Sequence, residues 1–143
     1  MKLLLNLIFM TLLNFGHTPK VNNQQLVGKW QCSSYDIRVD VFSENNEINA
    51  RLLSFPCWHK IKMSLSEHKD IHNPDKALRD RSLLNILILY GLKYETEGKW
   101  SNGSVYLPST GQTLRASIIR ISDNQVEIRG FLGFEFIGKS LTL

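Results

Sequence analysis

Residues 129–141 read RGFLGFEFIGKSL, and this stretch decides the fold. It follows two strand-like segments with only tight turns between them. Apolar side chains that alternate along consecutive antiparallel strands face a common interior, and glycines mark positions where a sheet bends or admits another backbone. The stretch therefore predicts part of a β-barrel, and it carries no catalytic pattern.

Working outward, the rest of the chain also favours strands. In residues 36–42 apolar side chains alternate with polar ones, which is typical of a half-buried strand. Turn residues at 43–46 then lead into a second arm, which Pro56 ends. Strands are predicted at residues 26–32, 36–42, 48–55, 83–92, 104–107, 112–121, 126–131 and 134–143, with later turns at 101–103, 108–111 and 122–124.

This tally indicates an all-β fold with a single up-and-down antiparallel barrel of about eight strands. A chain of 143 residues that is 43% hydrophobic can build one domain with a core. We place that domain at residues 19–143. Side chains either fill the interior of such a barrel or share it with one small ligand.

The long polar excursion at residues 58–82 differs from the rest because it lacks a period of two. Within it, Asn73, Pro74 and Asp75 resemble the start of a helix. Asn73 can accept from the first free amides, Pro74 suits the first helical position, and Asp75 faces the positive end of the helix dipole. We expect one short helix that ends at Arg81.

The first residues of the chain read as a secretory signal. Lys2 precedes an apolar run from Leu3 to Phe15, and the small and polar residues that follow suit a cleavage region. The run is shorter than the roughly 20 residues that cross a bilayer. We therefore expect residues 1–18 to be removed on export, with no integral membrane segment in the mature protein, which would be periplasmic or secreted.

Two cysteines remain after export, Cys32 and Cys57. An oxidising compartment permits a disulfide between them, and a loop of this length would stabilise the fold by about 3 kcal/mol. Buried free thiols are the alternative reading.

Charge and motifs argue against several functional classes. The net charge of +4 is mild and interleaved with acids, which favours a mixed-charge surface. Residues 129–136 resemble an RNA-binding strand, but Leu132 and Gly133 occupy the positions of a small residue and an aromatic. We expect no nucleic-acid partner, and no cofactor.

Metal binding and catalysis find little support. His68 and His72 would share a helical face, but the helix is predicted to begin only after them. An enzyme would have to use Asp70, Asp75, Arg79 and Arg81, which we read instead as a salt-bridged brace. We predict neither a metal site nor catalytic residues.

Several short motifs, taken in order, resemble the exported bacterial family called domain of unknown function 2147. They are Gly28-x-Trp30, Asp70-x-x-Asn73-Pro74-Asp75-x-x-Leu78-Arg79-x-Arg81, Gly98-x-Trp100-x-x-Gly103-x-x-Tyr106-x-Pro108-x-x-Gly111, and Arg129-Gly130-Phe131-Leu132-Gly133 with Gly138. The resemblance implies a calycin-like, lipocalin-like barrel in an exported protein, without an established activity. Structural roles are expected for Gly28 and for Trp30, which would plug one end of the barrel.

Two functions follow from this reading. The first is binding of a small apolar or amphipathic ligand in an interior lined by Val126, Ile128, Phe134 and Phe136. The second is a structural or interaction module of the cell envelope with a filled barrel. It would act through its outer surface, for example as a homodimer through residues 83–92, whose two faces are both apolar.

Overall fold

The computed structural model describes residues 23–32, 37–54, 65–132 and 138–142. The predicted signal at residues 1–18 lies outside these ranges, as do Cys57, Phe134 and Phe136. Within them the chain forms β-strands and three single turns of 3₁₀-helix, η1 (Asn23–Gln25), η2 (Leu65–Glu67) and η3 (Lys76–Leu78). The strands are β1 (Gly28–Gln31), β2 (Arg38–Glu44), β3 (Glu47–Ser54), β4 (Leu87–Thr96), β5 (Lys99–Leu107), β6 (Gln112–Ser122), β7 (Gln125–Phe131) and β8 (Gly138–Thr142).

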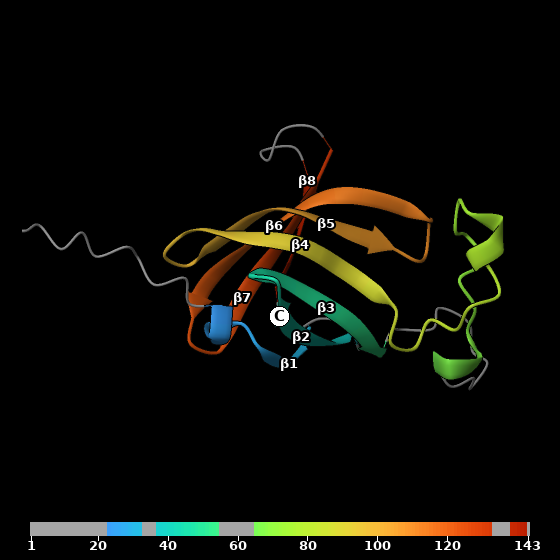
Figure 1. The fold of residues 1–143 in the computed structure, drawn as a ribbon, viewed down its shortest axis with the longest axis horizontal. Helices are drawn as coiled ribbons and strands as arrows, with labels where there is room; N and C mark the ends of the chain where they lie inside the picture. Colours follow the sequence, from blue (N-terminus) through green and yellow to red (C-terminus); the bar gives the residue numbers. More distant parts are fainter. Residues whose placement is uncertain (1–22, 33–36, 55–64, 133–137, 143) are drawn as a thin grey trace, which may run out of the picture.

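The strands form one antiparallel sheet in the order β1 to β8, so each strand pairs with its neighbours in sequence. The sheet curls into a half-barrel (Figure 1). No ladder joins β1 to β8 among the described residues, and these two strands are the edges of the sheet. The predicted all-β, up-and-down architecture is confirmed.

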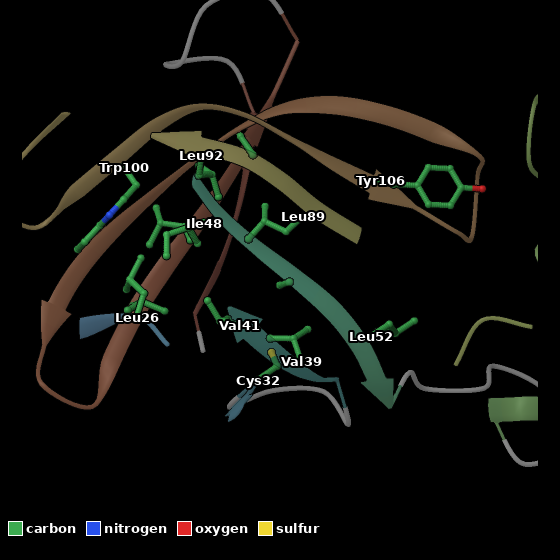
Figure 2. Close-up of a cluster of buried hydrophobic side chains, with 14 of the residues drawn as sticks. Leu26, Cys32, Val39, Val41, Ile48, Leu52, Leu89, Leu92, Trp100 and Tyr106 are labelled. Carbon is green, nitrogen blue, oxygen red and sulfur yellow. The ribbon is translucent and has the colours of Figure 1, made fainter. Parts of the chain in front are cut away.

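A single apolar cluster lines the concave side of the sheet (Figure 2). Directly paired residues on neighbouring strands share a face, and several such pairs are buried on both strands. They include Val39 with Leu52, Ala50 with Leu89, and Trp100 with Ile118. Burying each large aliphatic side chain contributes about 1.5–3 kcal/mol, so this face is the main source of stability.

The hairpin between β2 and β3 forms where the turn was expected. Asn45 and Asn46 have φ angles of 52° and 61°. Two successive residues with positive φ are typical of the type I′ turn, which matches the twist of the strands beside it. The predicted turn at 43–46 is therefore confirmed, shortened by two residues because β2 continues to Glu44.

The predicted turn at 101–103 is wrong, because these residues lie inside β5. Asn102 has a φ of 60°, and the pairing with β6 shifts register between Trp100 and Gly103. This irregularity is a β-bulge, which uses the same residues as a hairpin turn. The Asn-Gly pair signals positive φ and does not distinguish the two.

The predicted strand at 83–92 begins later, at Leu87, and continues to Thr96. A break in the alternation of side chains explains why the sequence of this strand looks apolar on both faces. The pairing with β3 shifts register so that Leu89 and Leu92, three positions apart, are both buried, and Gly91 between them has a φ of 73°. A bulge that changes the alternation thus turns both leucines toward the core.

Candidate functional site

Residues 65–86, which we name the strap, hold the polar cluster of this structure. The two arms of the strap run antiparallel. The N–H of Asp70 donates to the carbonyl of Arg81 over 3.1 Å, and that of Leu83 donates to the carbonyl of His68 over 2.8 Å. The strap lies at the end of the half-barrel opposite η1 (Figure 1).

The predicted helix in the strap is only the 3₁₀ turn η3, and the prediction that it reaches Arg81 is wrong. Asn73 does not cap it. Its Oδ1 accepts from the N–H of Asp75 over 2.8 Å, and Oδ1 of Asp75, the true cap, accepts from the N–H of Ala77 over 2.9 Å. Two successive side-chain turns of this kind compete with a regular helix. Pro74 precedes the cap and is exposed.

Asp70 is the centre of the cluster and is 0% exposed. Its Oδ1 accepts from the hydroxyl of Tyr106 over 2.5 Å. Its Oδ2 accepts from Nδ2 of Asn73 over 2.8 Å and from Nε of Arg81 over 2.9 Å, and a second guanidinium nitrogen of Arg81 also lies 2.9 Å away. A buried carboxylate is tolerated when it is paired and hydrogen-bonded in this way.

The predicted brace is therefore made by Asp70 and Arg81, while the other two residues assigned to it act differently. Nε of Arg79 donates to the carbonyl of Asn73 over 2.7 Å, and Asp75 caps η3. Arg81 also lies over the ring of Tyr106, with its Cζ 6.0 Å from the ring centroid.

The cluster is not arranged for acid–base chemistry. Burial and the hydrogen bond to Asp70 raise the pKa of Tyr106 to about 12, so its hydroxyl stays protonated at neutral pH. Both oxygens of Asp70 are already engaged. A general base must come within reach of a substrate proton, and this carboxylate is fully buried. The cluster fastens the strap to β5.

A second contact fastens the strap to the turn between β5 and β6. At Gly111, which has a φ of 73°, a Cβ atom would lie 1.8 Å from the carbonyl oxygen of His72. Only glycine allows the two backbones to approach this closely. The sequence suggested His72 only as a possible metal ligand on a helical face, and it did not indicate this role. Gly111 was part of the motifs that resemble the family.

The opposite end of the half-barrel is closed by a separate polar contact. Nε1 of Trp100, a fully buried residue, donates to Oδ1 of Asn23 in η1 over 2.8 Å, and Nδ2 of Asn23 donates to the carbonyl of Asn46 over 3.1 Å. Trp30, which was expected to plug one end of the barrel, is only half-buried. Its Nε1 donates to the carbonyl of Leu26 over 2.8 Å.

Gly28 and Cys32 complete the structural predictions. Gly28 has a backbone φ of 139°, a value that residues other than glycine rarely adopt. Cys32 is buried and its thiol is free in this structure. The predicted disulfide with Cys57, which lies outside the described residues, is therefore not confirmed.

The predicted ligand-lining residues are described only in part. Val126 is buried and Ile128 half-buried, and both belong to or pack on the core. Sequence reasoning missed Val105 and Leu114, which pair across β5 and β6 and are half-buried. The sequence showed that Leu114 alternates with polar neighbours, but it did not show how deeply each residue of a strand is buried.

Among the described residues, no group of three or more histidine, cysteine or acidic side chains could hold a metal ion. His68 is half-buried and His72 is exposed. The described part of the chain also contains no helix with the length and apolar character of a membrane span.

The curled eight-strand meander, with a 3₁₀ turn at one end and a strap at the other, defines a lipocalin-like β-barrel protein. Within this class, the chain belongs to the family described as an uncharacterized protein conserved in bacteria, DUF2147, whose sequence model matches residues 28–143. This confirms the resemblance drawn from the motifs.

One solved structure has the same fold. It is described as protein HP1028 from the human pathogen Helicobacter pylori, which belongs to the lipocalin family, and the match covers 82% of this chain and 80% of that one, with a TM-score of 0.69 and 24% sequence identity. No curated protein matches the chain.

Proposed function

We propose that this protein is exported to the periplasm or beyond and there binds a small apolar or amphipathic molecule on the concave face of its half-barrel. The secretory pattern at residues 1–18 supports the export. The fold supports the binding, because lipocalin-like barrels use an apolar interior to hold one small ligand.

The observation that carries the proposal is a group of core-facing residues that stay partly exposed. Val105 and Leu114 pair with each other, and a methyl group at Gly130 would lie 3.3 Å from both side chains. Gly130 pairs with Ala116, which is fully buried in the core. The two half-buried side chains therefore line the accessible part of the same face, near the strap end.

Binding of parinaric acid, a fluorescent fatty acid, tests the proposal. We expect saturable binding to the delipidated protein, and a lipid-like mass on the protein isolated by native mass spectrometry. Leu114→Trp should fill the site and weaken binding at least ten-fold. Ile121→Trp is the matched control, because Ile121 lies on the same strand but is 52% exposed. Equal affinity in both variants would count against the site.

A structural module with a filled barrel is the second candidate, and one contact favours it. A Cβ atom at Gly103 would lie 2.4 Å from Cγ of Leu92, so a side chain already occupies this part of the interior. Leu84 and Leu87 are 38% and 41% exposed, and we propose that a homodimer would bury them. Sedimentation at several concentrations tests this: a stable dimer that Leu87→Lys dissociates supports it, and a monomer throughout contradicts it.

A further inference from the structure

Both arms of the strap reach the core cluster at the rim of the half-barrel. Leu83 and Ile86, near its second end, are buried within the core cluster. Asp70, in its first arm, binds Tyr106, which lies between Val105 and Leu107 in β5. Tyr106 belongs to the same buried cluster as Leu83 and Ile86, and the half-buried Val105 packs against that cluster. The strap thus folds over the rim beside the partly exposed apolar residues.

Two contacts hold the outer part of the strap to the sheet, and we name them together the latch. They are the Asp70 cluster at Tyr106 and the close backbone contact of His72 with Gly111. From Ile71 to Asp80, each residue except Asn73 is exposed. Segments with little buried apolar surface open locally at lower free energy than the whole domain. Breaking the latch should therefore cost less than unfolding the barrel.

A joint is present where the strap meets the sheet. Asn85 has a φ of 63°, and this residue sits just before β4. Its N–H donates to the carbonyl of Leu52 over 2.8 Å, and the N–H of Leu52 donates to the carbonyl of Ile86 over 3.0 Å. These two bonds hold the joint to β3 while the arms that carry Asp70 lie beyond it.

We propose that the strap is a latched flap over the ligand entrance, and that breaking the Asp70–Tyr106 contact lets its two arms part and swing away from the rim. This inference rests on the proposed ligand-binding function. Opening uncovers Leu83 together with the rim of the core next to Val105. The ligand then enters and leaves only while the flap is open. The fraction of open molecules therefore scales the association and dissociation rates equally and leaves the affinity unchanged.

Stopped-flow binding of parinaric acid to Tyr106→Phe tests the flap. Removing a hydrogen bond to a buried charged group should raise the open population roughly ten-fold to a hundred-fold. The association and dissociation rates should both rise by this factor. Asn23→Ala is the matched control, because it removes a buried hydrogen bond to Trp100 at the opposite end. It should lower stability and leave both rates unchanged.

Hydrogen exchange provides a measurement that needs no ligand. In Tyr106→Phe the amides of Asp70 and Leu83, which are bonded between the strap arms, should exchange faster by the same factor as the binding rates. The amide of Arg120, bonded to Gly98 in the sheet, should not. Equal acceleration at Arg120, or binding rates that match those of Asn23→Ala, would overturn the flap. A wild-type protein that binds no parinaric acid contradicts the proposed function instead.

Discussion

The hydroxyl of Tyr106 donates to Oδ1 of Asp70, a residue 36 positions earlier in the chain, and this bond joins the strap to β5. The carboxylate is fully buried, and the guanidinium of Arg81 compensates its charge from the other arm of the strap. One buried carboxylate therefore holds together three segments: both arms of the strap and the strand beneath them.

Replacing Asp70 should destabilise the protein strongly. In Asp70→Asn the Arg81 charge loses its partner, and we expect a loss of about 3 kcal/mol in the free energy of unfolding, the low end for a broken buried pair because the Arg81 side chain is 37% exposed. Asp80→Asn is the control, since the pair of Asp80 with Lys69 is largely exposed and its loss should cost under about 1 kcal/mol. Urea unfolding measures both, and similar losses would refute the brace.

Tyr106 should ionise later than an ordinary tyrosine. Its pKa is raised from 10.0 to about 12, first by burial and then by the hydrogen bond to Asp70. The unfolded chain releases this proton near 10.0, so the stabilisation is complete below that pH and is lost as the pH rises toward 12. Absorbance titration of tyrosinate should show one late step that Tyr106→Phe removes. A late step that persists in this variant would assign it elsewhere.

Substitution of Gly111 should dislodge the strap. Gly111 and Gly91 share a φ of 73°, so alanine strains both backbones alike, but only at Gly111 would the new Cβ meet another backbone atom, the carbonyl oxygen of His72. We expect Gly111→Ala to cost at least about 2 kcal/mol more than Gly91→Ala. Thermal unfolding of the two variants provides the comparison. Equal losses would mean that strain alone accounts for the effect.

Gly103 should tolerate a methyl group less well than Gly130. A Cβ at Gly103 would lie 2.4 Å from Cγ of Leu92 and 2.9 Å from the carbonyl oxygen of Tyr90, whereas one at Gly130 meets only side-chain atoms at 3.3 Å. We expect Gly103→Ala to cost about 1–3 kcal/mol and Gly130→Ala less. Chemical denaturation ranks the two. A larger loss at Gly130 would show that the bulge can shift to admit the extra carbon.

The local pattern of the sequence was enough for most strands and for the tight turns. Alternation of apolar and polar side chains in residues 36–42 and 112–121 predicted β2 and β6, because such alternation is the period of a β-strand. Positive φ at Asn45 and Asn46 followed from the residue types. The same signal at Asn102 and Gly103 gave a wrong turn, because whether a positive φ reverses the chain or makes a bulge depends on the strand that pairs beside it.

The candidate site was less predictable than the fold. The sequence motifs that resemble the family contain its residues, but they did not predict which residue contacts which. Asp70 and Arg81 form the buried pair, Arg79 binds a backbone carbonyl, and Asp75 caps η3, although all four look alike as charges in a loop.

The sequence by itself determined the β-class, the order of the strands and most of the places where the chain turns, because these depend on side-chain alternation and on the φ preferences of single residues. Only the tertiary structure decided which carboxylate is buried, that Tyr106 is its donor, and that His72 lies on Gly111. These contacts join segments about 35–40 residues apart. Their geometry follows from how the strap packs on the curled sheet, and no local pattern encodes that packing.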